Sequence, residues 1–196
     1  MGSRGKPARP IVIAVCGSPG AGKTSVASAA ALRLGVPLLT RDELKQGLGL
    51  SSGSVDPDDL AQMPPDFHIA GGPFTVRAER AMVAAAFTLA SSGVTFVVET
   101  SVLSDDLLDT VAACGAVVLA VHVVASKQTI GKRLQARAVD GGAVAQQLAE
   151  QFDRGEMVPS IFRPPTRVDV VVELDTSEDD EPNTRTIETA LIALLR

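Results

Sequence analysis

The residues best suited to chemistry form one short segment, residues 17–24 (GSPGAGKT), in which a glycine and four further residues precede Gly-Lys-Thr. In a loop of this kind the backbone N–H groups converge on phosphate oxygens, and the glycines permit the close approach. We expect Lys23 to reach the β and γ phosphates and the Thr24 hydroxyl to ligate magnesium. The segment therefore predicts a site for ATP and Mg2+, formed by Gly17, Ser18, Pro19, Gly20, Ala21, Gly22, Lys23, Thr24 and Ser25.

Two acidic residues stand where strands are predicted to end. Asp42, with Arg41 beside it, follows the predicted strand 36–39, and Glu99 ends the predicted strand 94–98. Because ligands of open parallel sheets gather at the carboxyl ends of the strands, we interpret Asp42 as the base that accepts the proton of an attacking hydroxyl. Arg41 would help to bind that substrate, and Glu99 would hold magnesium, directly or through a water. The alternatives are a first-turn helix acid for Asp42 and a solvated strand end for Glu99.

Basic residues provide a third group of candidates. Arg133 and Arg137 are spaced i, i+4 on one face of a predicted helix and could close over the transferring phosphoryl group, although solvated helix arginines are common. Weaker candidates for that role are Arg154, Arg163 and Arg167. His68, Arg77 and Arg80 are candidate substrate-binding residues, whereas His122 is interpreted as a core or strand-end histidine.

These residues need a scaffold in which strands and helices alternate. Helix-capping residues are predicted at Gly35, Thr40, Ser104 and Ser126. Residues 50–72 predict a long irregular segment that lies over the substrate. The predicted strands cover residues 11–16, 36–39, 94–98, 116–124 and 168–173, and the predicted helices cover residues 24–34, 42–47 or 42–49, 74–92, 104–114, 126–138, 143–154 and 181–195. The alternation predicts an α/β fold, a parallel sheet with helices on both faces.

Composition limits the classes of protein. The 196 residues predict a single domain, with residues 1–10 as a flexible tail and no secretory signal, so a cytoplasmic location is expected. No apolar run approaches the roughly 18 residues that span a bilayer, so no membrane partner is expected. The net charge of -5 and the absence of Trp and Tyr disfavour a nucleic-acid partner. Cys16 and Cys114 lie in apolar runs typical of core thiols.

The loop, the triplet Thr40-Arg41-Asp42, the sequence VVETS at residues 97–101 and the Arg-x-x-x-Arg pair at residues 133–137 occur in this order. With them the chain resembles the small phosphate-loop kinases that include chloramphenicol phosphotransferase, zeta-toxin-like kinases and the kinase domain of polynucleotide kinases. The resemblance implies a phosphate-loop NTPase fold of kinase type, with a five-stranded parallel sheet whose central strand leads into the loop, and an aspartate base at Asp42. Glu99 departs from the pattern, because many of these kinases carry Asp there.

Three functions remain open from the sequence. The first is an ATP-dependent phosphotransferase that acts on a hydroxyl of a small molecule, such as an antibiotic or a sugar-like metabolite. The second is a polynucleotide 5'-hydroxyl kinase, and the third is a nucleotide-dependent ATPase switch that binds a protein partner. No Asn-Lys-x-Asp guanine motif and no Leu-Ser-Gly-Gly-Gln transporter motif occurs, which favours the kinases. The acceptor and the oligomeric state cannot be derived from these residues.

Overall fold

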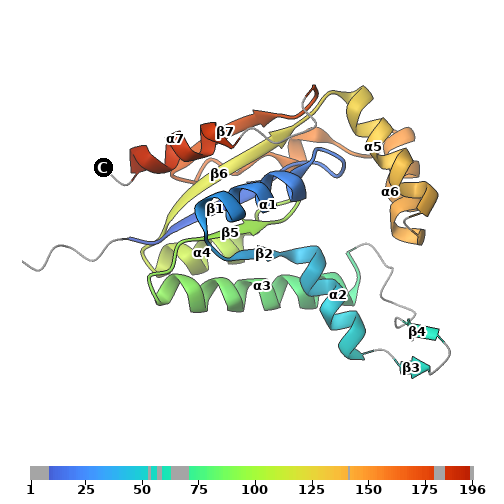
Figure 1. Cartoon of the computed structure of the whole chain (residues 1–196), viewed down its shortest axis with the longest axis horizontal. Coiled ribbons are helices and arrows are strands. Elements are labelled where there is room, and N and C mark those ends of the chain that lie inside the picture. The colour runs from blue at the N-terminus through green and yellow to red at the C-terminus, as the bar shows by residue number, and fades with distance from the viewer. Residues whose placement is uncertain are drawn as a thin grey trace, which may run out of the picture.

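The computed structural model describes residues 9–52, 54–56, 59–62, 71–140, 142–178 and 184–194. One five-stranded sheet has the strand order β2-β5-β1-β6-β7, and its neighbouring strands run parallel. The predicted fold class is confirmed, with the strand before the glycine-rich loop at the centre of the sheet (Figure 1). The strands are β1 (Ile11–Cys16), β2 (Leu38–Thr40), β5 (Phe96–Glu99), β6 (Val117–Val124) and β7 (Val170–Asp175).

Helices pack on both faces of the sheet, and two helices late in the chain lie together beyond the carboxyl ends of the strands (Figure 1). α1 and α7 cover one face, and α3 and α4 cover the other. α2 packs against α3, and α5 packs against α6. The helices are α1 (Lys23–Leu34), α2 (Arg41–Ser52), α3 (Pro73–Ser91), α4 (Asp105–Ala113), α5 (Lys127–Asp140), α6 (Gly142–Asp153) and α7 (Arg185–Leu194), with a 3-10 turn at Pro159–Phe162.

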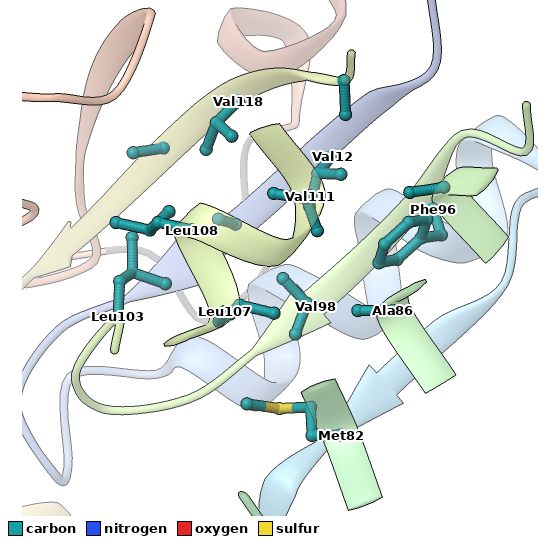
Figure 2. Close-up of a cluster of buried hydrophobic side chains, with 14 of the residues drawn as sticks. Val12, Met82, Ala86, Phe96, Val98, Leu103, Leu107, Leu108, Val111 and Val118 are labelled. Carbon is teal, nitrogen blue, oxygen red and sulfur yellow. The ribbon is translucent and has the colours of Figure 1, made fainter. Parts of the chain in front are cut away.

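The central strand β1 is buried on both sides, which explains its apolar sequence without alternation. Val12 and its neighbours on one face pack with Phe96 of β5, Met82 of α3 and Val111 of α4 (Figure 2). Ile13 and the other odd-numbered residues of β1 face α1 and α7 in a second core. A strand held in this way gives the loop that follows it a rigid starting point.

The four predicted caps are confirmed. Gly35 ends α1 in the left-handed conformation with a φ of 66°. The side-chain oxygens of Thr40, Ser104 and Ser126 accept hydrogen bonds from the backbone N–H groups of Glu43, Leu107 and Thr129, over distances of 3.2, 3.3 and 3.1 Å. Local sequence therefore fixes where these helices begin and end.

Other boundaries differ from the prediction. α2 continues through Gly47 and Gly49 to Ser52, because this helix packs against α3 and buries Gly49. The segment predicted as irregular contains an antiparallel pair, β3 (Ser54–Asp56) and β4 (Asp59–Gln62). The strands predicted at 36–39 and 168–173 are observed two residues later, as β2 (Leu38–Thr40) and β7 (Val170–Asp175). Residues 181–183, the predicted start of the last helix, lie outside the described residues.

Part of the predicted N-terminal tail is anchored to the sheet. Arg9 donates a hydrogen bond from Nε to the Gly115 carbonyl oxygen over 2.9 Å, and the Pro10 carbonyl accepts one from the Val117 N–H. Residues 9 and 10, the part of the predicted tail that the structure describes, are therefore held against the sheet. Within the described part of the chain, no helix has the length and apolar character needed to cross a membrane.

Candidate functional site

The glycine-rich loop connects the end of β1 to the start of α1, as its sequence predicts. Gly17, Gly20 and Gly22 have φ angles of 141°, 82° and 90°, which side chains rarely tolerate. A Cβ atom on Gly17 would overlap with the backbone carbonyl oxygen of Val123 in β6. Glycine is therefore required at position 17 because the loop passes directly against the neighbouring strand.

The far end of the loop is tied to elements from the C-terminal half of the chain. Thr176, just after β7, donates a hydrogen bond from Oγ1 to the Ala21 carbonyl oxygen over 2.8 Å. Arg133 of α5 donates from Nη1 to the Thr176 Oγ1 over 2.9 Å and to the Gly20 carbonyl oxygen over 3.4 Å, and from Nη2 to the Thr176 carbonyl oxygen over 2.9 Å. Arg133 thus joins α5, the loop and the end of β7.

The loop and the first turn of α1 fit a triphosphate and a magnesium ion. Gly22 precedes α1 and has no side chain with which to cap it, so the positive end of the helix dipole faces the loop. Lys23 Nζ donates to the Ser18 carbonyl oxygen over 3.0 Å, which places the ammonium over the start of the loop. Thr24 and Ser25 are exposed in the first turn, where a hydroxyl can reach a metal ion.

Lys23 and Glu99 form a buried electrostatic pair beside the loop. Lys23 is 8% exposed and Glu99 is 4% exposed, at the end of β5 where it pairs in register with Val15 and Thr40. Burial lowers the pKa of Lys23, and the negative charges of Glu99 and then Asp42 oppose that effect. Burial likewise raises the pKa of Glu99, and the charge of Lys23 opposes it. The solvated strand end considered for Glu99 is therefore wrong, because this carboxyl is buried.

Asp42 lies in the first turn of α2, directly after β2, and its charge reaches both members of the pair. Its side chain is 82% exposed, and Asp42 Oδ1 is 3.6 Å from Arg41 Nη2. The structure thus brings together Lys23, Glu99, Asp42 and Arg41, and it leaves Asp42 open to an incoming molecule. Its position in the first turn also suits the helix dipole, so the base and the first-turn helix acid both stay predictions for Asp42.

A family comparison agrees with this geometry. The model of a family described as an AAA domain, AAA_33, matches residues 12–158. The chain belongs to the AAA_33 family. Among curated proteins, none matches the chain.

Solved structures show the fold of this AAA_33 chain. A "putative kinase" from Chloroflexus aurantiacus superposes with a TM-score of 0.73 at 19% identity, over 96% of this chain and 100% of the other. The APS kinase CysC of Mycobacterium tuberculosis, in complex with AMPPNP and APS, gives 0.53 at 20% identity, over 97% and 99%. A sugar kinase from Janibacter sp. HTCC2649 gives 0.50 at 16% identity, over 97% and 99%. The expected kinase-type phosphate-loop fold is confirmed.

The arginine and histidine candidates of this AAA_33 chain lie in different parts of the structure. The positive charge of Arg137, an exposed residue of α5, reaches Lys23, whereas the guanidinium of Arg133 is held by Thr176. Arg77 stacks over the Phe74 ring at 5.0 Å, and Arg80 lines a groove between α3 and α4 that contains no loop residue. His68 lies outside the described residues.

The three weaker arginine candidates are also separated. Arg154 pairs with Glu156 over 2.8 Å, and Arg167 pairs with Asp105 and Asp109 of α4 over 2.9 and 2.6 Å. These two arginines are engaged in surface ion pairs. Arg163 instead lines a cavity next to the loop.

No sequence pattern indicates that cavity. It lies at the carboxyl end of β6 and is lined by Ser18 of the loop, His122, Phe152 of α6 and Phe162 of the 3-10 turn, among others. His122 is 8% exposed, and its Nδ1 is 3.4 Å from Glu173 Oε2 of β7. The prediction of a core or strand-end histidine is confirmed, because His122 is buried in β6 two residues before the strand ends. Only the position of residues 155–163 over β6 reveals that this histidine borders an open space.

Proposed function

We propose that the protein is an ATP-dependent phosphotransferase that moves the γ-phosphoryl group of ATP to a hydroxyl of a small molecule. The observation that carries this proposal is the grouping of two unlike carboxylates around Lys23. Glu99 is buried beside Lys23, whereas Asp42 is exposed to solvent. A buried acid suits a metal ion, and an exposed acid at the same site can meet an acceptor.

In the proposed reaction, the acceptor oxygen bonds to the γ-phosphorus, the bond to the oxygen bridging to the β-phosphate breaks, and ADP leaves. Asp42 takes the hydroxyl proton. The loop N–H groups and Lys23 hold the β and γ phosphates, and Arg137 adds positive charge where charge develops on the transferred group. Thr24 and Glu99 would hold Mg2+, which supplies further charge neutralisation of the phosphates.

The structural neighbours support a kinase. The proteins with the same fold include one called a sugar kinase and an APS kinase solved with AMPPNP, an ATP analogue, and with APS. The net charge of -5 and the absence of Trp and Tyr favour a small acceptor over a polynucleotide. We therefore place the protein with kinases of small hydroxyl compounds.

The test combines an acceptor screen with substitution of Asp42. Purified protein with MgATP is mixed with hydroxyl compounds, and accelerated ADP release identifies an acceptor. Asp42→Asn should then slow single-turnover phosphoryl transfer by roughly 10² to 10⁴, the loss expected without a positioned base, while ATP affinity changes little. Glu43→Gln, in the same helical turn, is the matched control and should retain transfer.

Two results would contradict parts of this proposal. If Asp42→Asn transfers phosphate normally but melts at a lower temperature, Asp42 is only a helix-stabilising acid. If no hydroxyl compound accelerates ADP release, and a slow ATP hydrolysis responds only to an added protein, the protein is a nucleotide-dependent switch. Transfer to the 5' end of an oligonucleotide would instead show a polynucleotide kinase.

A further inference from the structure

The cavity beside Ser18 has the size and position of a ligand site. Its volume is about 520 Å³, within the range usual for small-molecule pockets. Strand β6 forms its floor through His122, Val123 and Val124, while α5, α6 and the segment that follows α6 form its walls. These walls come from parts of the chain far apart in sequence, so the space is a product of the tertiary fold.

The cavity meets the loop at the end that Lys23 reaches. Ser18 is the loop residue in its lining, and the Ser18 carbonyl accepts the hydrogen bond from Lys23 Nζ. Arg133 and Thr176 hold the other end of the loop, at Gly20 and Ala21. The proposed function assigns Lys23 to the β and γ phosphates, so the Ser18 side of the cavity would adjoin the γ-phosphoryl group. Ile130, in the α5 wall of the cavity, lies close to Gly20.

The cavity walls are mainly apolar. Ile130 of α5, Phe152 of α6, and Met157 and Phe162 of the following segment supply aliphatic, aromatic and thioether surface. Phe152 packs closely on α5 at Gly131. A Cβ atom on Gly131 would lie only 3.0 Å from the Phe152 Cε1. Glycine at position 131 therefore lets the two helices approach and fixes one aromatic wall.

A small set of polar groups accompanies this apolar surface. His122 is buried and faces Glu173, whereas Lys127, Arg163 and Glu173 are exposed at the edge. Two cationic side chains and one anionic side chain favour a neutral or anionic ligand over a cationic one. A polyol would have to place several hydroxyl groups against aromatic and aliphatic walls without hydrogen-bond partners, which costs free energy for each group.

We propose that this cavity holds the body of the phosphate acceptor, and that the acceptor is a neutral or anionic alcohol carrying an apolar ring. The ring packs between Phe152 and Phe162, and the hydroxyl extends past Ser18 toward Lys23 and Asp42, which lie outside the cavity lining. This inference rests on the proposed phosphotransferase function and specifies its substrate class. It excludes linear polyols as preferred acceptors.

A direct test uses 8-anilinonaphthalene-1-sulfonate, an anionic ring compound whose fluorescence rises in apolar sites. The full-length protein should bind this probe, and Phe162→Ala should weaken binding at least tenfold. Ile161→Ala is the matched control, because Ile161 is the neighbouring residue of the same 3-10 turn, is 56% exposed and does not line the cavity. If Phe162→Ala lowers the melting temperature sharply, Phe162→Leu serves in its place, with a smaller loss expected. Equal probe binding by the wild type and the Phe162 variant overturns the proposal.

A second arm separates this inference from the function on which it rests. Ring-bearing alcohols and linear polyols of similar size are compared as acceptors through ADP release. The proposal expects turnover of ring-bearing alcohols, with KM raised about tenfold or more in Phe162→Ala, kcat nearly unchanged and ATP affinity retained. Turnover of polyols with an unchanged KM in that variant overturns the acceptor class but leaves the phosphotransferase function standing.

Two further outcomes are also decisive. Weaker ATP binding in Phe162→Ala would show that the cavity holds the nucleotide, and would overturn the assignment to the acceptor. If neither class of alcohol is phosphorylated and ATP hydrolysis alone depends on Lys23, the proposed function fails, and the acceptor assignment fails with it.

Discussion

At the scale of single residues, the site depends most visibly on Gly17. Its φ of 141° and its contact with β6 leave no room for a side chain. Gly17→Ala should therefore destabilise the protein by at least about 2 kcal/mol, because the clash is with backbone that cannot rotate away. Urea unfolding measures the loss.

Gly35→Ala provides the control for that change. Gly35 has a φ of 66°, but no atom of the described residues lies within 4 Å of the position a Cβ would take. Its substitution should cost only the left-handed backbone penalty of about 1 kcal/mol. If both variants lose the same free energy of unfolding, the close approach of the loop to Val123 does not contribute to the cost of a side chain at position 17.

The residues of the loop were fully predictable because their signal is local. The spacing of the glycines and the following Lys-Thr pair specify the loop without reference to the rest of the chain. By contrast, the sequence could not assign His122 to a cavity, since Phe162 and Glu173 approach it only through tertiary folding. A histidine at the carboxyl end of a strand was the available signal, of the same kind that singled out Glu99.

At the scale of elements, the helices and strands follow local rules until packing overrides them. The caps at Thr40, Ser104 and Ser126 behave as predicted. The glycines at positions 47 and 49 do not end α2, because the contact with α3 compensates for their low helix propensity. Contacts between elements distant in sequence therefore account for what local rules missed.

The two arginines of α5 have different contacts, which predicts different roles for them. Arg133 donates hydrogen bonds to Thr176 and to the Gly20 carbonyl oxygen. The charge of Arg137 reaches Lys23, and the described contacts include no such hydrogen bonds for Arg137. Arg133→Lys keeps the charge but loses the forked hydrogen bonds, so we expect ATP affinity to fall about tenfold with a smaller change in the transfer rate. Arg137→Lys should instead lower the transfer rate, with a smaller change in ATP affinity. ATP titration and single-turnover kinetics measure the two effects.

The opposite pattern would restore the original interpretation of both arginines as one pair over the transferring phosphoryl group. In that case Arg133→Lys would lower the transfer rate as much as Arg137→Lys does, with ATP affinity unchanged. The hydrogen bonds of Arg133 would then have to open when nucleotide binds.

At the scale of the whole molecule, the candidate site draws on most of the chain. Lys23 begins α1, Asp42 begins α2, Glu99 ends β5, and Thr176 follows β7. These positions lie near the carboxyl ends of the parallel strands, in a sheet that is covered on both faces. Because the strand order 2-5-1-6-7 places β1 between β5 and β6, the loop lies beside strands from both halves of the sequence.

Binding of MgATP should therefore stabilise the folded chain as a unit. At 100 times its Kd, a ligand that binds only the folded state adds about 2.7 kcal/mol, which raises the Tm of a protein of this length by roughly 5–11 °C. Lys23→Met should abolish most of that shift, because the phosphates lose their buried cation. Without ligand, Lys23→Met removes a charge whose burial costs free energy but also leaves the buried Glu99 carboxyl without its positive partner, so the shift of each protein is measured from its own Tm without ligand. Lys132→Met, at an exposed position of α5, is the control and should keep the full shift. An equal shift in Lys23→Met and the wild type would mean that MgATP binds elsewhere, because the loop of residues 17–24 cannot hold a triphosphate equally well without its lysine.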